Sequence, residues 1–470
     1  MKTLKDLYSN YPEIEIKGIK INSKDVKSGD LFVCTMGVTA DRHDYVEDAV
    51  ANGAVAIVAS KKIDVTVPVV YVEDTNKELI NVCRKFYDFD DSLLNLIGIT
   101  GTNGKTTTAL IIQALMGDDI CGYQGTNGII CSKFNEHIVN TTPDADRLYM
   151  YFDRFIKAGC KYLSIETSSE AFYRNRLDTL KFKVGLLTNI TQDHLNIHKT
   201  IENYVNCKKE LFKKVSDDGY SILNVDDKYY DEFRSIAKGK ILTYGKGESD
   251  LQIINISEEI DKTLITFKYR DKEYNITSLL LGEFNVYNLC GGILALLALD
   301  FDMDKIIDNI KKIKAPAGRC ELLNYGQDYS IILDYAHTPD AFKNIYKLLN
   351  KIKKNRIITI TGSAGGREHE KRPDMGKIVL DNSDYVIFTM DDPRNEDVNS
   401  IIDDLVSSSD SSNYERIIDR KEAIFKAFDM AEKDDIVLVA GKGIDNYMAL
   451  GSEYVPYCDL DVINEYFEKE

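Results

Sequence analysis

A glycine-rich stretch with a lysine and three threonines could bind a nucleotide phosphate; it reads Gly101-Thr102-Asn103-Gly104-Lys105-Thr106-Thr107. Its glycines let backbone N–H groups turn inward around an anion, Lys105 would reach the terminal phosphates, and the Thr106 hydroxyl can hold Mg²⁺. The general phosphate-loop pattern has another glycine five residues before Gly104, where this chain has Ile99. The alternative is a glycine-rich turn with a purely structural role, but the Gly-Lys-Thr-Thr sequence favours a phosphate loop.

A second set of polar residues follows two predicted strands. Glu166 comes directly after residues 162–165, and Asp193-His194 lies beyond residues 184–187. In doubly wound sheets ligands gather at the carboxyl ends of strands, so a carboxylate and an imidazole are expected to converge near the phosphate loop. Mg²⁺ needs only one or two protein ligands besides phosphate oxygens and water. A solvated or locally bonded role for these side chains stays open.

The elements that must position these residues alternate between strand and helix. An apolar strand over 93–99 precedes the glycine-rich stretch, and a helix buried on most sides follows over 108–116. Other strands are predicted at 31–34, 54–59, 69–72, 221–224, 331–333, 357–360, 385–388 and 436–440, short β-like runs at 251–281, and helices at 45–52 and 286–299. The last unit reads as Rossmann-like, without a GxGxxG loop.

Polar bends divide the chain into three predicted α/β domains. The first bend covers residues 87–92 and the second follows the lysine-rich segment that ends at Pro316. The predicted domains are an N-terminal domain over 1–92, a central phosphate-loop domain over 93–313 and a C-terminal Rossmann-like domain over 314–470.

Composition limits the partners. The 470 residues carry a net charge of −17, which argues against a general affinity for nucleic acid or for an anionic membrane. Nine cysteines without a CxxC pair indicate neither a disulfide framework nor a zinc cluster. No apolar segment reads as a signal peptide or a membrane span, so we expect a cytoplasmic protein without membrane insertion.

The ordered motifs resemble those of the Mur ligases, closest to the members that add the third peptide residue. They are Gly101-Thr102-Asn103-Gly104-Lys105-Thr106-Thr107, Asn140-Thr141-Thr142-Pro143, Glu166-Thr167-Ser168-Ser169, Thr188-Asn189-Ile190-Thr191-Gln192-Asp193-His194-Leu195, Gly282-Glu283-Phe284-Asn285-Val286-Tyr287-Asn288, Gly318-Arg319, Asp334-Tyr335-Ala336-His337-Thr338-Pro339 and Ala440-Gly441-Lys442-Gly443. An N-terminal Asn22-Ser23-Lys24 resembles the UDP-binding domain of those members. The resemblance covers nearly the whole chain.

The resemblance implies a UDP-binding, a central ATPase and an amino-acid-binding domain, in an ATP-dependent amide ligase. Its expected substrates are UDP-N-acetylmuramoyl-L-alanyl-D-glutamate, ATP and a diamino acid, with Mg²⁺, and a monomer is expected. Such a ligase phosphorylates the D-glutamate γ-carboxylate, and an amine then attacks the acyl phosphate. Charge neutralisation at the transferring phosphoryl group would come from Lys105, Thr106 and Mg²⁺.

The resemblance also implies roles for individual residues. Glu166 and His194 match magnesium ligands, and Lys208 matches a lysine that the family carbamylates (N6-carboxylysine), which helps to hold a second Mg²⁺. Asn288, Arg319 and Asp334, in addition to the glycine-rich stretch, match residues that contact ATP. Residues that match contacts to the muramoyl-peptide substrate are Ser23, Thr141, Thr142, Ser168 and Arg176. An arginine suits a carboxylate or phosphate because its planar fork can bond both oxygens.

The incoming amino acid is read from the last motifs. Members that add meso-diaminopimelate carry Asp-Asn-Pro-Arg, whose arginine binds the distal carboxylate; here the motif is Asp391-Asp392-Pro393-Arg394. Arg367, Gly441 and Asp445 match further contacts, with Asp445 one methylene shorter than the usual glutamate. The extra anion at Asp392 favours L-lysine. However, L-lysine has no distal carboxylate, so the two arginines, Arg367 and Arg394, would be left without an anionic partner. The motif favours meso-diaminopimelate, and L-lysine stays the alternative.

Two rival functions are weighed against a ligase of this kind. A folylpolyglutamate synthetase shares the ligase core but is not expected to carry the N-terminal pattern or residues 391–394. A phosphate-loop switch would need no amino-acid pocket, which Arg367, Arg394 and Asp445 disfavour, although a weakened paralogue with a regulatory role would have nearly the same sequence.

Overall fold

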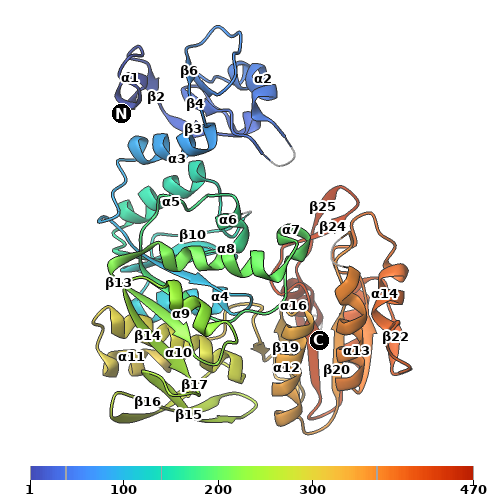
Figure 1. Cartoon of the computed structure of the whole chain (residues 1–470). Coiled ribbons are helices and arrows are strands. Elements are labelled where there is room, and N and C mark those ends of the chain that lie inside the picture. Colours follow the sequence, from blue (N-terminus) through green and yellow to red (C-terminus); the bar gives the residue numbers. More distant parts are fainter. Residues whose placement is uncertain (1, 38–39, 139, 367–368, 469–470) are drawn as a thin grey trace. The chain divides into compact units, whose positions relative to one another are not determined.

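The computed structural model describes residues 2–37, 40–138, 140–366 and 369–468 (Figure 1). They form two compact units. The first comprises Met1–Gly98, Gly117–Val184 and Lys214–Gly219, and the second Ile99–Met116, Gly185–Lys213 and Tyr220–Glu470. Three strands, β7 (Asn95–Thr100), β12 (Phe182–Leu187) and β13 (Val215–Asn224), run from one unit into the other. The domain boundaries after residues 92 and 313 stay a prediction.

The first unit begins with a small parallel sheet in the order β3-β4-β5-β6. Its strands are Gly18–Lys20, Asp30–Val33, Ala56–Ala59 and Val69–Tyr71. Helix α2 (Val46–Ala51) packs Val46 and Ala49 into a core with Phe32, Cys34 and Ile57. β4, β5, β6 and α2 match the predicted strands and helix, whereas β3 was not predicted. The remaining elements are β1 (Lys2–Thr3), α1 (Leu4–Leu7), β2 (Glu15–Ile16) and α3 (Thr75–Phe86).

The second part of this unit contains four neighbouring strands of a larger, 11-stranded mixed sheet, in the order β10-β9-β8-β11. The strands are Phe134–Glu136, Gly128–Cys131, Cys121–Gly125 and Tyr162–Glu166, and β11 runs parallel to β8. Helix α5 (Ala145–Ala158) buries Leu148, Phe152 and Phe155, which the helical period places on one face. Helix α6 (Ser169–Tyr173) starts three residues after β11, so Glu166 and Ser168 lie at a strand-to-helix junction.

The second unit holds the glycine-rich stretch between β7 and α4 (Lys105–Met116). Helix α4 packs against α10 (Glu283–Ala298), and both are buried on most sides, as their apolar runs predict. The neighbouring elements are α7 (Leu195–His198), α8 (Ile201–Lys213), α9 (Tyr230–Ile236), β14 (Lys240–Gly245), β15 (Leu251–Glu258), β16 (Thr263–Tyr269), β17 (Lys272–Ser278) and α11 (Met303–Ile310). Strands β15 to β17 form an antiparallel meander, which the predicted β-like runs match.

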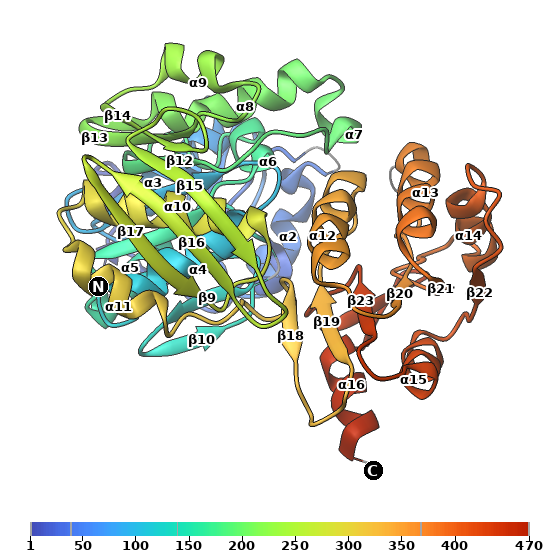
Figure 2. The ribbon, with the colours of Figure 1, turned by 90° about the horizontal axis from the view of Figure 1, so that it is seen from below.

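The C-terminal part of this unit is a six-stranded sheet in the order β18-β19-β23-β20-β21-β22. Its strands are Glu321–Leu323, Ser330–Asp334, Ile436–Ala440, Ile357–Thr361, Tyr385–Phe388 and Tyr414–Arg416, all parallel except β18. Figure 2 shows helices on both faces: α12 (Pro339–Ile352), α13 (Arg372–Asn382) and α14 (Val398–Val406) on one, α15 (Arg420–Met430) and α16 (Asp459–Glu468) on the other.

Alternate residues of these strands enter two different cores. Ile332 and Leu438 belong to the core beneath α12 to α14, whereas Ile331 and Val437 belong to the core beneath α15 and α16. Both faces of the sheet are therefore apolar, which is why its strands are continuous hydrophobic runs. This is the Rossmann-like arrangement predicted from the sequence.

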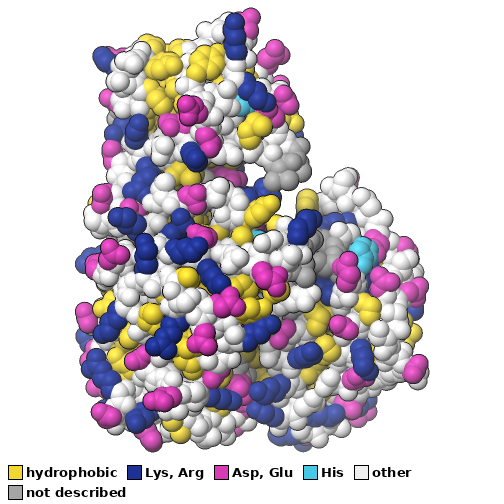
Figure 3. Space-filling model, in the orientation of Figure 1, with side chains coloured by type: hydrophobic (Ala, Val, Ile, Leu, Met, Phe, Trp, Pro, Cys, Tyr) yellow, Lys and Arg dark blue, Asp and Glu magenta, His cyan; other side chains and the backbone are white. Residues whose placement is uncertain are grey.

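The loops at the carboxyl ends of β19, β20, β21 and β23 leave the same edge of the parallel sheet, where ligands of such folds bind. A hairpin, β24 (Tyr447–Leu450) and β25 (Glu453–Pro456), follows β23. In the described part of the chain, every helix is too short or too polar to cross a bilayer. Figure 3 shows acidic and basic side chains interspersed over the visible face.

Candidate active site

The glycine-rich stretch turns tightly at both glycines. Gly101 has φ 149° and Gly104 has φ 84°, conformations that other residues rarely adopt. A Cβ atom at Gly101 would lie 1.8 Å from Thr188 Oγ1, and one at Gly104 would lie 2.2 Å from Asn288 Oδ1. Both positions therefore require glycine because the neighbouring side chains fill the space.

The segment after β12 holds this loop in shape. The backbone N–H of Thr102 donates to Asn189 O at 2.7 Å, and the Thr188 hydroxyl donates to Asn103 O at 2.6 Å. In return Thr191 N donates to the Thr102 hydroxyl at 2.9 Å. The Thr-Asn-Ile-Thr segment at 188–191 thus forms the wall of the loop and orients its backbone.

Lys105 and Lys208 both donate to the carbonyl of Gly101. Lys105 Nζ lies 3.0 Å from Gly101 O and 2.9 Å from Thr102 O, and Lys208 Nζ lies 2.6 Å from Gly101 O. Burial, and then the nearby charge of Lys105, lower the pKa of Lys208 well below its usual range. Lys208 is 1% exposed, and this environment favours its uncharged amine.

Tyr204 links Lys208 to the loop. Its hydroxyl lies 3.0 Å from Thr102 Oγ1, and Lys208 Nζ lies 4.6 Å from the centre of its ring. Tyr204 and Lys208 are one helical turn apart on α8, so one face of this helix supplies both contacts. The sequence reasoning did not single out Tyr204, although its position four residues before Lys208 was a usable signal.

Six of the predicted ATP-side residues line one cavity of about 350 Å³ within the second unit: Asn103, Gly104, Thr107, Asn288, Arg319 and Asp334. This volume is within the range of small-molecule sites. Asn288 Oδ1 accepts from Thr108 Oγ1 at 3.2 Å, and the Arg319 guanidinium lies 4.3 Å from the centre of the Tyr335 ring. Burial raises the pKa of Asp334.

One contact joins the phosphate loop to the Rossmann-like part of the same unit. Asn103 Nδ2 donates to Asp340 Oδ2, in the first turn of α12, at 2.9 Å. Both residues line the 350 Å³ cavity. The cavity is therefore bounded by the loop on one side and by the start of α12 on the other.

Glu166 is a buried carboxylate at the end of β11, in the first unit. It is 1% exposed, and its oxygens accept hydrogen bonds from Tyr123 OH at 2.6 Å, Thr126 N at 2.9 Å and Thr126 Oγ1 at 3.2 Å. All three donors are neutral, so they orient the carboxylate without compensating its charge. The side chain therefore suits a cation.

His194 lies in the second unit, on the segment before α7, with φ 54°. Its ring is exposed, and Nε2 lies 3.5 Å from Asp193 Oδ2. Burial opposes ionisation of Asp193, but the charges of His194, His337 and Lys371 outweigh it and lower the pKa of Asp193. Asp193 is therefore an anion beside the imidazole.

Two of the predicted muramoyl-peptide residues of the first unit, Ser168 and Arg176, donate hydrogen bonds to a third, Thr142. Its hydroxyl donates to Glu166 O at 2.8 Å and accepts from Ser168 N at 3.3 Å, and its carbonyl accepts from Arg176 Nη1 at 2.9 Å. Thr141 Oγ1 lies 3.1 Å from Thr126 Oγ1. Four predicted residues are thus connected through two loops.

Arg176 also lines a cavity of about 670 Å³ in the first unit. Its Nε donates to Asp144 Oδ1 at 2.6 Å. Residues of this cavity that the sequence reasoning missed include three cationic side chains: Arg42, Lys77 and Arg174. Ser23 lies elsewhere in the unit, 5% exposed, at the start of a 3-10 turn over Ser23–Asp25.

The predicted amino-acid residues lie at the carboxyl ends of β21 and β23. Asp391 and Asp392 are buried, and Arg394 is half-buried with Nη1 donating to Gly365 O at 2.7 Å. Gly441 is buried, and its N–H donates to Asp334 O at 3.2 Å. Burial, and then the neighbouring acids, raise the pKa of Asp445 to about 6 despite Lys442. Arg367 lies outside the described residues.

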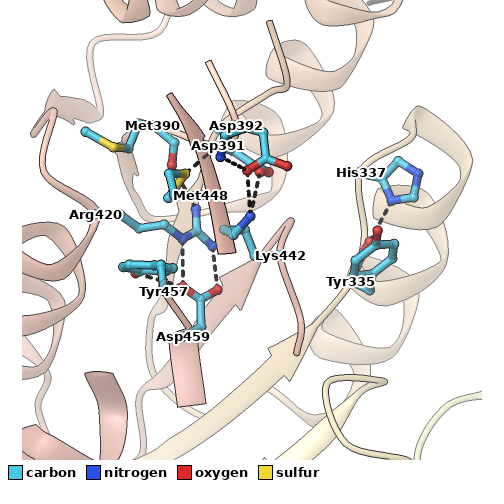
Figure 4. Close-up of polar contacts among 12 residues, drawn as sticks. Tyr335, His337, Met390, Asp391, Asp392, Arg420, Lys442, Met448, Tyr457 and Asp459 are labelled. Atoms are coloured by element: carbon cyan, nitrogen blue, oxygen red, sulfur yellow. Dashed lines mark hydrogen bonds and ion pairs between the residues drawn. The ribbon is translucent and has the colours of Figure 1, made fainter. Parts of the chain in front are cut away.

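Two buried ion pairs beneath these residues were not predicted (Figure 4). Lys442 Nζ donates to Asp392 Oδ1 at 2.8 Å. Arg420 bonds both oxygens of Asp459, at 2.8 and 2.7 Å, and also donates to Ala440 O at 2.9 Å. Both side chains of the second pair are 0% exposed. The partners are distant in the chain, so no local pattern could have revealed them.

The fold and the site define a phosphate-loop α/β protein with a nucleotide-sized cavity that the phosphate loop and a second, Rossmann-like sheet both line. Three family models match successive regions. They are the "Mur ligase family, catalytic domain" over residues 15–97, the "Mur ligase middle domain" over 99–296 and the "Mur ligase, glutamate ligase domain" over 318–443. The chain belongs to the Mur ligase family, as its motifs predicted, and it has the family's three-domain α/β fold.

Relatives match over nearly the whole chain. The UDP-N-acetylmuramoyl-L-alanyl-D-glutamate--2,6-diaminopimelate ligase of Bacillus cereus is 39% identical over 462 residues, 96% of this chain and 94% of the relative. The enzyme of the same name from Fusobacterium nucleatum is 39% identical over 95% of this chain and 92% of the relative. A solved structure of a ligase of that name is 27% identical, with a TM-score of 0.68, and covers 100% of this chain and 99% of its own.

Proposed function

We propose that this protein is an ATP-dependent amide ligase of peptidoglycan precursor synthesis. It joins meso-diaminopimelate to the D-glutamate γ-carboxylate of UDP-N-acetylmuramoyl-L-alanyl-D-glutamate. The observation that carries the proposal is the phosphate loop on a 350 Å³ cavity, in a chain 39% identical over 96% of its length to a diaminopimelate ligase.

The loop supports the first chemical step. The γ-phosphoryl group of ATP moves to a carboxylate oxygen, ADP leaves, and two anions must approach one another. Lys105, together with backbone N–H groups of the loop, would supply positive charge for this approach. The 350 Å³ cavity is the proposed nucleotide site. By resemblance, Asn288 lies on the adenine side, and Arg319 and Asp334 lie towards the ribose and phosphates.

The second step forms the amide bond. The amine of the incoming amino acid attacks the acyl carbon, phosphate leaves, and the amine loses a proton. Arg394 binds the distal carboxylate of meso-diaminopimelate, and Asp445 faces its distal ammonium. Arg367, Asp391 and Gly441 complete the amino-acid site, and Asp392 belongs to the same turn as Arg394.

Mg²⁺ supplies charge neutralisation at the phosphates when it is bound. Thr106 of the phosphate loop and, by resemblance, Glu166 and His194 would be its ligands, and the oxygen donors of Thr106 and Glu166 fit a hard cation. The buried carboxylate of Glu166, which accepts hydrogen bonds from the neutral groups of Tyr123 and Thr126, supports this assignment.

Lys208 fits carbamylation. An uncharged amine reacts with carbon dioxide and a protonated one does not, and the lowered pKa of Lys208 favours the uncharged form. The carbamylated side chain is an anion that would help to hold a second Mg²⁺.

The first unit contributes the muramoyl-peptide site. Arg176, at the 670 Å³ cavity, suits the negative groups of that substrate, and Thr141, Thr142, Ser168 and Ser23 provide neutral contacts.

We propose three domains over 1–92, 93–313 and 314–470, and a monomer that works in the cytoplasm without nucleic acid or membrane insertion.

The names of the relatives favour meso-diaminopimelate over L-lysine as the added residue. The family match over residues 15–97 disfavours a folylpolyglutamate synthetase, because that enzyme is not expected to carry this N-terminal region.

Phosphate release tests the proposal. The purified protein is given ATP, Mg²⁺ and UDP-N-acetylmuramoyl-L-alanyl-D-glutamate, with meso-diaminopimelate and L-lysine in parallel. We expect phosphate only when both the muramoyl dipeptide and an amino acid are present, and faster release with meso-diaminopimelate. Faster release with L-lysine would correct the substrate, and no release with either would favour a regulatory paralogue.

A further inference from the structure

The turn that carries Arg394 has an unusual backbone. Asp392 has φ 46° and Arg394 has φ 51°, on either side of Pro393. Residues other than glycine rarely adopt positive φ, and such conformations persist where the surroundings hold them. The contacts that hold this turn therefore also decide where the Arg394 side chain begins.

A single oxygen atom makes the central contact (Figure 4). Asp392 Oδ1 accepts from Lys442 Nζ at 2.8 Å and from the backbone N–H of Ala449 at 2.9 Å. The Lys442 side chain is 0% exposed and that of Asp392 is 11% exposed. Lys442 Nζ lies farther from the other acid of the turn, 4.0 Å from Asp391 Oδ1. Lys442 thus compensates mainly the charge of Asp392.

Strand β24 continues this contact to Arg394. The N–H of Arg394 donates to Ala449 O at 2.9 Å, and the N–H of Gly451 donates to Arg394 O at 2.8 Å. The N–H of Asp392 points to Met448 Sδ at 3.2 Å. The hairpin therefore binds the turn at Asp392 and at Arg394, and Lys442 fixes the same oxygen from the sheet side.

The guanidinium of Arg394 is oriented at its other end. Its Nη1 donates to Gly365 O at 2.7 Å, in the loop after β20. The direction of this side chain thus depends on the turn beneath it and on one carbonyl beside it. A shift of the turn would move the guanidinium away from the carboxylate it is proposed to bind.

We infer that Asp392 and Lys442 form a positioning pair that sets Arg394 for the distal carboxylate of the amino acid, and that Asp392 does not itself read the distal ammonium. This inference rests on the proposed function. It removes the reason for expecting L-lysine, because the anion at Asp392, where related sequences have asparagine, is neutralised inside the protein.

Three variants test the pair: Lys442→Met, Asp392→Asn and the double variant. Lys426→Met, an exposed lysine of α15, is the matched control. Steady-state phosphate release gives kcat and KM for meso-diaminopimelate and for L-lysine, and thermal unfolding reports whether each variant folds. The wild type is measured first, since its failure to use either amino acid would refute the proposed function and not the pair.

Lys442→Met should raise KM for meso-diaminopimelate about tenfold or more, with a smaller change in kcat, because Asp392 is left buried and unpaired. The double variant should recover much of this loss, since replacing both partners leaves no unpaired charge. Asp392→Asn should keep the preference for meso-diaminopimelate over L-lysine within about threefold, because an amide oxygen still accepts from Lys442 and Ala449.

Two results would overturn the inference. A change in preference of about tenfold or more in Asp392→Asn would mean that Asp392 reads the amino acid. An unchanged KM in a folded Lys442→Met variant would mean that the pair does not position Arg394. If Lys442→Met does not fold, the preference of Asp392→Asn still decides between positioning and direct reading.

Discussion

The phosphate loop and the turn at residues 391–394 are both binding sites at strand ends, but they are built differently. In the loop, seven consecutive residues and the adjacent segment 188–191 shape a backbone surface, and two glycines make it possible. In the turn, side chains from four separate segments meet, and two buried ion pairs hold them. The residues that shape the backbone surface of the loop are mostly consecutive in the sequence. The residues that form the buried ion pairs come from distant parts of the chain.

The two constructions should fail in different ways. Changing a charge beneath the turn should cost stability, because a buried partner is left unpaired. Changing the lysine of the loop should cost mainly rate, because that side chain serves a ligand, and only a little stability, because two hydrogen bonds to loop carbonyls are lost. Four variants test this difference between the two sites.

Asp459→Ala should have the largest effect. It leaves the Arg420 guanidinium buried without its carboxylate, and we expect a loss of about 3–5 kcal/mol in the free energy of unfolding. Denaturant unfolding of the purified variant measures it. Lys421→Ala, which breaks the exposed pair with Glu465, is the control, with an expected loss below about 1 kcal/mol. Equal losses would show that the buried pair is no more important than a surface one.

Lys105→Met should lower kcat about 10²- to 10³-fold, because one cationic donor to the transferring phosphoryl group is removed. Phosphate release measures kcat, and the unfolding midpoint should stay close to that of the wild type. A variant with lost activity and a strongly lowered midpoint would contradict the contrast between the two sites.

Arg394→Ala should weaken the use of meso-diaminopimelate by about 2–4 kcal/mol in kcat/KM, and the use of L-lysine much less. The physical reason is that only meso-diaminopimelate brings a distal carboxylate to the guanidinium. Competition between the two amino acids in one reaction gives the ratio directly. Equal losses for both would count against a contact with the distal carboxylate.

Asp445 should give the smallest effect, visible as a pH dependence. Its pKa is raised to about 6, so the carboxyl is neutral below that pH and loses its attraction for the distal ammonium. KM for meso-diaminopimelate should therefore rise as pH falls through about 6, by up to about tenfold per pH unit. Asp445→Asn should show a raised KM without this step, and a step that persists in the variant would assign it to another group.

Much of the fold followed from local sequence patterns. A strand over 93–99 and a helix over 108–116 were predicted from an apolar run, a glycine-rich turn and a second apolar run, and the structure has them at Asn95–Thr100 and Lys105–Met116. The four central strands of the C-terminal sheet were predicted because both faces are buried and, apart from Ser330 and Asp334 at the ends of β19, every residue in them is apolar or β-branched. These signals are local, so one stretch of residues carries each.

The candidate site was predicted less completely. Lys442 lies inside the motif Ala440-Gly441-Lys442-Gly443, but its partner Asp392 is 50 residues away, and only the fold brings them together. Arg420 and Asp459 carry no motif at all, and each resembles an ordinary surface charge in the sequence. In the sequence, the extra acid at Asp392 suggested a preference for L-lysine. Its buried counter-ion, Lys442, could not be recognised from the sequence alone.

The hydrogen bonds of Lys105 to the carbonyls of Gly101 and Thr102 have a thermodynamic consequence. An incoming phosphate therefore competes with two internal acceptors for the ammonium group, so binding at this lysine is at least in part an exchange of partners. A ligand with diffuse or single negative charge gains little from such an exchange, while a terminal polyphosphate gains more. Binding at the loop therefore favours ligands with a high density of negative charge over ligands with a single or diffuse charge.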